Sequence, residues 1–114
     1  MAINFKHDVR SDGIQPEGAY IVIVAHRVWQ RYMRRDLTVT SITDGKHSVN
    51  SLHYQGLAVD LRIKDDETGL PFNGRQQLVA VQELRRHLGN AYDVVLEPTH
   101  IHVEYDPKTG GASV

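Results

Sequence analysis

Residues 57–63 read Leu-Ala-Val-Asp-Leu-Arg-Ile (LAVDLRI), and this alternation is the clearest structural signal in the chain. Successive side chains of a β-strand point to opposite faces, so the four aliphatic residues share one face, while Asp60 and Arg62 share the other with Ala58. The aliphatic face is expected to pack on a core. The small side chain of Ala58 leaves space beside Asp60. The stretch therefore predicts a strand that carries a carboxylate on its open face.

The residues before this strand predict a helix and another strand. Residues 1–14 are polar and rich in turn formers, and we expect them to form an N-terminal arm. Apolar residues recur at helical spacing after Pro16, which suits a first helical turn, so a helix is expected over residues 16–34. Residues 37–43 (LTVTSIT) alternate and are rich in β-branched side chains, which predicts a strand.

The residues after it predict a loop over residues 64–74 and then a second helix. Asn73 can cap this helix, with Gln76 at the capping-box position, and Gly89 can end it. Its expected apolar stripe consists of Leu78, Val81, Leu84 and Leu88.

Two short strands, residues 92–96 and 100–105, complete the chain. The strands come in pairs around one long helix, and a parallel doubly wound sheet would need more crossover helices. The sequence therefore predicts an α+β fold with a small, mainly antiparallel sheet flanked by two helices.

Composition restricts the classes of protein to which the chain can belong. It has 114 residues and no cysteine, with 13 lysines and arginines against 14 aspartates and glutamates, a net charge of −1. We expect one domain over residues 1–114 that folds without disulfides. The balanced charge favours no nucleic-acid partner, and the longest apolar run, residues 20–25 (YIVIVA), is too short to cross a membrane. With no signal-peptide pattern at the start, we expect a cytoplasmic monomer.

The last predicted strand carries a pair of histidines. In residues 100–104 (HIHVE), His100, His102 and Glu104 share one face, and the two aliphatic residues share the other. The aliphatic face is expected to pack on the core, so both imidazoles lie on the open side of the sheet.

A third histidine can reach the same face from a loop. His53 lies seven residues before Asp60, which on a straight strand would place the two on opposite faces. Gly56 between them permits a bend or bulge, so His53 can approach Asp60. Two imidazoles and a carboxylate form a metal ligand set, and three ligands without cysteine leave a position for water, as in catalytic zinc sites. We therefore expect Zn²⁺ bound by His53, Asp60 and either His100 or His102.

The same set of ligands also occurs in non-haem iron oxygenases. We disfavour that interpretation because the histidine and aspartate of those enzymes usually lie closer together in sequence.

Residues 51–60 (SLHYQGLAVD) and 99–105 (THIHVEY) together resemble the zinc D-alanyl-D-alanine peptidase and Hedgehog signalling-domain superfamily. Its zinc peptidases have a SxHxxGxAxD signature and a third ligand on a later strand. The Hedgehog version is very close to SLHYxGxAVD with a HIH strand. The resemblance covers residues 37–105, and small phage and prophage peptidases of this type have a similar size. It implies a Hedgehog/DD-peptidase-like fold.

The resemblance implies zinc ligation by His53 and Asp60. In relatives with an acid-x-x-His pattern the histidine binds zinc, which points to His100. In relatives with a His-x-His strand the second histidine binds zinc, which points to His102. We assign His102 as the ligand, with His100 beside the metal as a proton donor or oxyanion stabiliser.

The resemblance also implies roles for residues around the metal. Glu97 is the expected general base. His47 matches a histidine that lines the Hedgehog pseudo-active site, and Ser51 opens the signature. Many members have an arginine after the strand that precedes the zinc loop, and residues 41–44 contain none. Either Lys46 substitutes for it or the substrate is held differently. With Lys46 as the substitute, the expected substrate-binding residues are Lys46, His47 and Ser51.

Together these residues imply a zinc metallopeptidase that hydrolyses peptidoglycan stem peptides, either as a D-alanine carboxypeptidase or as an endopeptidase. A cytoplasmic, single-domain enzyme of this kind fits a phage lysis enzyme that reaches the cell wall on release. The alternative is a non-catalytic, zinc-stabilised Hedgehog-like binding module. Glu97 discriminates between the two, because a binding module needs no carboxylate beside the open metal position.

Overall fold

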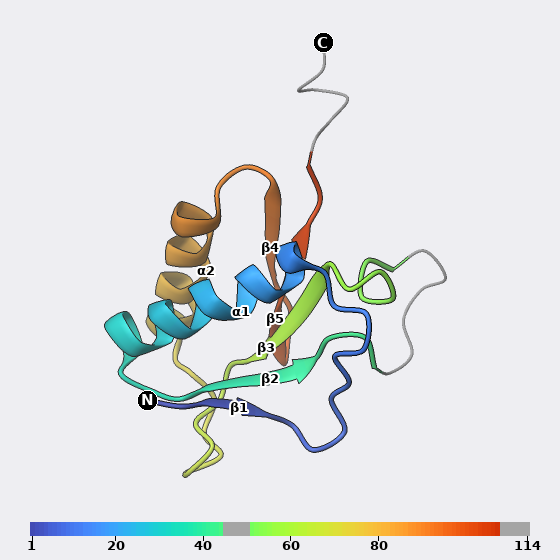
Figure 1. Ribbon diagram of the computed structural model, residues 1–114. Coiled ribbons are helices and arrows are strands. Elements are labelled where there is room, and N and C mark those ends of the chain that lie inside the picture. The colour runs from blue at the N-terminus through green and yellow to red at the C-terminus, as the bar shows by residue number, and fades with distance from the viewer. Residues whose placement is uncertain (45–50, 108–114) are drawn as a thin grey trace.

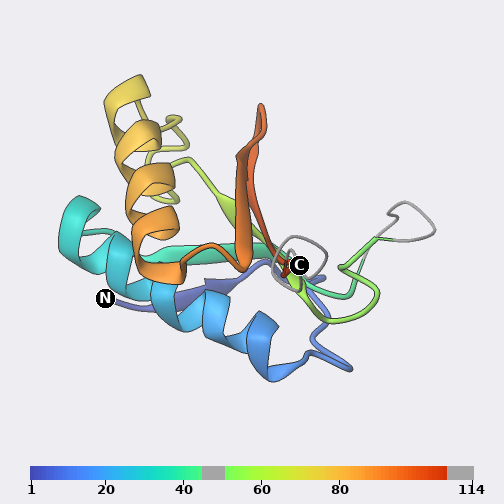
Figure 2. The ribbon, with the colours of Figure 1, turned by 90° about the horizontal axis from the view of Figure 1, so that it is seen from above.

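A five-stranded mixed sheet forms the centre of the fold, and two helices pack on one of its faces (Figures 1 and 2). The computed structural model describes residues 1–44 and 51–107. The elements in chain order are β1 (Ile3–Phe5), α1 (Pro16–Val28), the π-helical turn η1 (Trp29–Met33), β2 (Leu37–Ser41), β3 (Ala58–Arg62), α2 (Gly74–Leu88), β4 (Tyr92–Leu96) and β5 (His100–Tyr105). The predicted α+β class is confirmed.

The strands lie in the order β1-β2-β3-β5-β4. β1 pairs with β2 in parallel, and the pairs β2–β3, β3–β5 and β5–β4 are antiparallel, as expected of a mainly antiparallel sheet. The sequence did not indicate β1, which lies within the segment expected to be an arm. Three residues are too few for alternation to be recognised, and the strand forms because Ile3 pairs with Leu37 at the edge of the sheet.

Helix α1 has Pro16 in its first turn, as expected, but the regular helix ends at Val28 rather than near residue 34. The chain continues as the turn η1, which buries Trp29 and ends at Arg34 in the left-handed conformation, with φ of 54°. The predicted helix is therefore correct in position and too long by its last turn.

Helix α2 begins with the predicted capping box. The backbone N–H of Gln76 donates to Asn73 Oδ1 at 2.8 Å, and Gln76 Oε1 accepts from the backbone N–H of Asn73 at 2.9 Å. The buried stripe differs from the prediction at one position, because Leu78 is exposed and Ala80 is buried. At 3.6 residues per turn, Ala80 and Leu84 lie near the middle of the buried face of the helix, and Leu78 lies to one side of it.

The helices leave the other face of the sheet uncovered near the middle strands. Val59 and Leu61 of β3 and Ile101 and Val103 of β5 are buried in the core with residues of both helices. The alternation of these strands places Asp60 and the β5 histidines on the opposite face.

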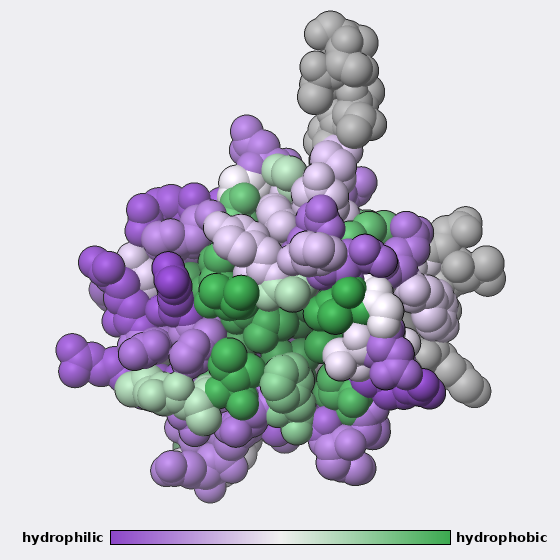
Figure 3. Space-filling model, in the orientation of Figure 1, coloured by the Kyte–Doolittle hydropathy of each residue, from purple (hydrophilic) through white to green (hydrophobic). Residues whose placement is uncertain are grey.

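The surface on the side of α1 carries an apolar area (Figure 3), to which the exposed side chains of Phe5 and Ile23 belong. Among residues 1–44 and 51–107, no helix is both long and apolar enough to cross a membrane.

Candidate metal centre

A tight turn before β3 brings His53 to the sheet. The backbone N–H of Gly56 donates to the carbonyl of His53 at 3.0 Å, and that of Leu57 donates to the carbonyl of Leu52 at 3.0 Å. Gly56 has a φ of 73°, and a Cβ at this position would lie 2.2 Å from the carbonyl oxygen of Gly13. Only glycine fits both the backbone conformation and this close approach. The bend expected at Gly56 is therefore present.

Strand register supplies the other two side chains. Asp60 of β3 lies directly opposite His102 of β5. Asp60 Oδ1 is 3.2 Å from His53 Nε2 and 3.0 Å from His102 Nδ1, and the two nitrogens are 3.3 Å apart. These three atoms thus form a triangle in which every side is close to 3 Å. We refer to the three residues as the histidine cluster.

The outer partners of both imidazoles fix which nitrogen carries the proton. His53 Nδ1 lies 2.7 Å from the carbonyl oxygen of Ile42, which can only accept, so Nδ1 carries the hydrogen. His102 Nε2 lies 2.7 Å from Glu104 Oε1 and likewise donates. In the neutral imidazoles, His53 Nε2 and His102 Nδ1 therefore turn lone pairs toward the carboxylate of Asp60.

Three lone pairs that face one another require a cation or a proton between them. Burial by itself raises the pKa of Asp60, but the hydrogen bonds of His102 and His53, with the positive charge of His53 and His100, outweigh it and hold that pKa well below its ordinary value. The hydrogen bond to Asp60 raises the pKa of His102 against the opposing effect of burial. His53 is 2% exposed and Asp60 is 8% exposed, so little solvent reaches these groups.

The chemistry and spacing of the histidine cluster suit a zinc ion. Zinc bonds of about 2.0–2.2 Å to imidazole nitrogen and carboxylate oxygen, at tetrahedral angles, place neighbouring ligand atoms about 3.3–3.6 Å apart. The observed separations of 3.0–3.3 Å lie at or slightly below the lower end of this range, so a small outward shift of the side chains accommodates the ion. The hydrogen bonds to Ile42 and Glu104 are the kind of outer contact that orients metal-binding histidines.

Of the two β5 histidines, His102 is the one that completes the cluster. Its Nδ1 and the ligand atoms of His53 and Asp60 all lie within 4.8 Å of one another. His100 is on the same face, but its Nε2 lies 3.7 Å from Asp60 Oδ1, and its Nδ1 is 3.1 Å from Thr99 Oγ1. His100 therefore lies at the edge of the cluster.

The remaining expected residues divide between the hairpin and the zinc loop. Glu97, in the turn between β4 and β5, donates its backbone N–H to the carbonyl of His100 at 2.9 Å, which places it opposite His100 and on the same face. Ser51 Oγ accepts from the backbone N–H of His53 at 3.2 Å and thus stabilises the turn. Lys46 and His47 lie outside the described residues.

Sequence reasoning did not identify Glu104 as an outer partner of the cluster. The signal was visible, because Glu104 follows His102 by two residues on a strand and so shares its face. The Ile42 carbonyl, in contrast, could not be found from sequence, since it comes from a segment that only folding brings near His53.

A hollow of about 580 Å³ adjoins the cluster at Asp60. Its lining includes Asp60, His100, Thr40 and Ser41, and Ser41 is the strand partner of Asp60. The hollow is also lined by three cationic residues, Lys6, Arg62 and Lys64. Of the histidine cluster, Asp60 borders this hollow, so a ligand in the hollow would lie beside the carboxylate.

Comparison of the chain with protein-family models, curated proteins and solved structures finds no match in any of the three.

Proposed function

We propose that this chain is a zinc-dependent peptidase with the Hedgehog/DD-peptidase-like architecture that the motifs of residues 51–60 and 99–105 imply, and that it acts on peptidoglycan stem peptides. The observation that carries the proposal is the convergence of two imidazole lone pairs and a carboxylate beside a hollow. A purely structural zinc site usually has four protein ligands, whereas three leave a position for chemistry.

Zinc bound by His53, Asp60 and His102 would supply a Lewis acid for a peptide carbonyl and lower the pKa of water. Glu97 is the proposed general base, which takes a proton from the attacking water and gives it to the leaving amine. His100, at the edge of the histidine cluster, is the proposed hydrogen-bond donor to the developing oxyanion. Both side chains belong to the open face, on the hairpin that also carries His102.

Position within the hairpin supports the role of Glu97. Val95 lies directly opposite His102, and Glu97 is two residues further along the same strand direction and on the same face. Such a diagonal neighbour lies about 7–8 Å away, which leaves room for a water and a substrate carbonyl. The chemistry therefore fits the space between Glu97 and the histidine cluster.

The test is digestion of purified peptidoglycan by the zinc-loaded protein, with and without a chelator, and identification of new termini by mass spectrometry. We expect zinc-dependent release of stem-peptide fragments, as a cell-wall enzyme of the phage lysis type would give. Absence of any new terminus while zinc is bound would contradict a peptidase and support the zinc-stabilised binding module.

Replacing the proposed base separates catalysis from metal binding. Glu97→Ala should lower the rate by about 10²–10⁴-fold, because proton transfer typically contributes that much, while one zinc per chain remains bound. Glu67→Ala is the matched control, since Glu67 is an exposed residue of the loop after β3. Hydrolysis by Glu97→Ala at the parental rate would refute the role of Glu97.

A further inference from the structure

We infer that the hollow beside the histidine cluster is an anion subsite, centred on Arg62, for a substrate carboxylate one residue beyond the scissile bond. The inference rests on the proposed function and extends it, because it distinguishes between removal of a terminal residue and cleavage inside a peptide. It depends on charge, exposure and strand geometry around β3.

The charge of the lining residues favours an anion. Among the described residues that line the hollow, Lys6, Arg62 and Lys64 are cationic, and Asp60 is the one carboxylate. Asp60 is itself committed to His53 and His102. An anionic group that enters the hollow therefore meets an excess of positive charge.

The carboxylates that pair with these cationic side chains do not occupy all of their hydrogen-bond donors. Arg62 Nη1 is 2.9 Å from Asp66 Oδ1, and a guanidinium has five N–H donors, so one such contact leaves others for a ligand. Lys6 Nζ lies 3.5 Å from Asp8 Oδ2, and both side chains are substantially exposed, which makes this a weak pair.

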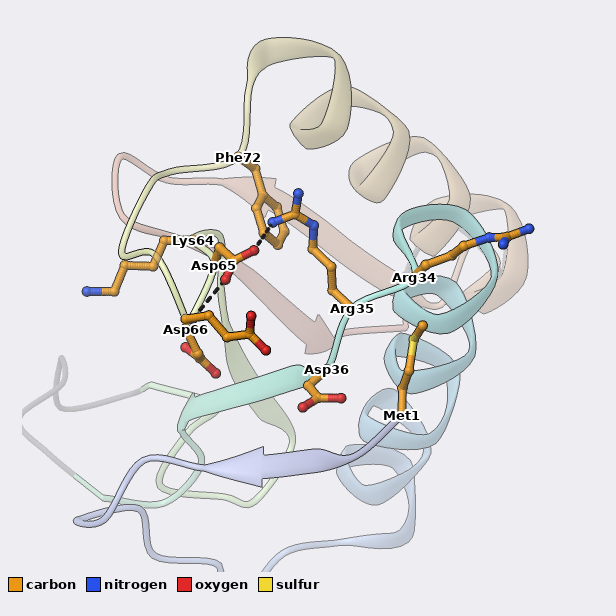
Figure 4. A pocket seen from close by; sticks show the side chains of 9 residues that line it. Met1, Arg34, Arg35, Asp36, Lys64, Asp65, Asp66 and Phe72 are labelled. Carbon is orange, nitrogen blue, oxygen red and sulfur yellow. Dashed lines mark hydrogen bonds and ion pairs between the residues drawn. The ribbon is translucent and has the colours of Figure 1, made fainter.

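Lys64 lines this hollow and also a second one, which Figure 4 shows. In the second hollow, Arg35 Nη1 pairs with Asp65 Oδ2 at 2.6 Å, and the Arg35 guanidinium lies over the ring of Phe72, 5.2 Å from its centre. Figure 4 shows the Lys64 side chain extending away from this pair. In the second hollow the charge of Arg35 is therefore paired, whereas Lys64 adds to the charge beside Arg62.

Strand geometry sets the distance from the metal position. Arg62 is two residues beyond Asp60 on the same face of β3 and lies directly opposite His100. Two residues of an antiparallel strand span about 6.8 Å. One extended substrate residue covers about 3.4 Å, and a charged hydrogen bond adds about 2.8 Å. A carboxylate on the residue directly after the scissile bond thus comes within reach of Arg62.

The test measures binding as well as cleavage, with three probes and the zinc-loaded protein. N-acetyl-D-alanyl-D-alanine has a terminal carboxylate, its C-terminal amide has none, and N-acetyl-D-alanyl-D-glutamic acid 1-amide has one on a side chain. We expect a carboxylate-bearing probe to bind about 10- to 100-fold more tightly than the neutral amide, since the contact is a charged hydrogen bond. Tighter binding of the first probe alone, relative to the amide, indicates a site for a terminal carboxylate. Binding of the third probe as tightly as the first indicates that a side-chain carboxylate is also accepted.

Arg62→Gln should abolish the preference, because glutamine keeps a polar contact to Asp66 but carries no charge. Arg27→Gln, on the exposed side of α1, is the matched control and should leave the preference unchanged. A preference that survives in Arg62→Gln would mean that the metal itself holds the carboxylate and would overturn the subsite. Equal binding of all three probes by the parent would overturn it as well.

The two proposals fail separately. If the amide is cleaved as efficiently as the acid in a zinc- and Glu97-dependent reaction, the peptidase stands and the subsite falls. If no peptide is cleaved but the Arg62-dependent binding preference is present, the subsite stands in a protein that is a binding module.

Discussion

Strand β5 contributes to two groups of three ionisable side chains, and they differ in ways that matter for a metal. The histidine cluster combines two imidazoles with Asp60 in a buried position, whereas Asp93, Glu104 and Asp106 form an acidic group of half-buried carboxylates. In both groups the ligand atoms lie within 4.8 Å of one another. Proximity alone therefore does not distinguish a metal centre.

The orientation of the ligand lone pairs and the degree of burial do distinguish the two groups. The histidine cluster has its proton positions fixed from outside by Ile42 and Glu104, so its lone pairs converge. In the acidic group, Asp93 lies directly opposite Glu104 in the pairing of β4 with β5, where like charges oppose each other. Glu104 belongs to both groups and accepts a hydrogen bond from His102 Nε2–H. Glu104 is thus the member of the acidic group that supports the histidine cluster.

The largest expected effect comes from removing the central carboxylate of the histidine cluster. Asp60→Ala should lose bound zinc and all hydrolysis, because Asp60 contacts both imidazoles. Asp93→Ala is the control and should keep one zinc per chain. Metal analysis after dialysis measures both, and zinc retained by Asp60→Ala but lost by Asp93→Ala would reverse the comparison.

A smaller effect is expected at the residue that the two groups share. Glu104→Ala should weaken zinc binding about 10- to 100-fold, as is typical when an outer partner of a metal-binding histidine is removed. Glu104→Gln should recover part of the loss, because its amide oxygen can still accept from His102. Titration against a competing chelator measures the affinity. An equal loss of affinity in Asp93→Ala would indicate that nearby negative charge in general supports zinc binding, and not the specific contact of Glu104 with His102.

The smallest effect is a dependence of thermal stability on pH. The folded protein raises the pKa of His102, so without metal its protonated form stabilises the fold at low pH, and this contribution is lost as pH rises through the raised pKa. Zinc binds the unprotonated imidazole, so the stabilisation that zinc gives to the fold grows as pH rises. The difference in melting temperature between zinc-loaded and chelator-treated protein should therefore widen from pH 5.5 to pH 7.5. Calorimetry measures this, and a constant difference would argue against ligation by His102.

Much of the sheet could be predicted because short-range alternation is written into the strands. Val59 and Leu61 are buried and Asp60 lies on the other face, as the LAVDLRI stretch predicts. The capping box at Asn73 and Gln76 is equally local and was predicted with its start residue. Strand β1 and the π-helical turn after Val28 were not predicted, because pairing with β2 and burial of Trp29 are long-range effects.

The identity of the candidate ligands was accessible from the sequence because strand periodicity and a glycine bend relate His53, Asp60 and His102 to one face. Strand periodicity left His100 and His102 open, and the resemblance favoured His102; the register of β3 with β5 places Asp60 opposite His102 and Arg62 opposite His100. The proton positions and the basic hollow likewise depended on Ile42, Glu104 and Lys6, which come from separate parts of the chain. Local side-chain patterns thus determined which groups face the open side, and only tertiary packing decided which of them meet, because distances between strands are set by pairing and not by spacing along the chain.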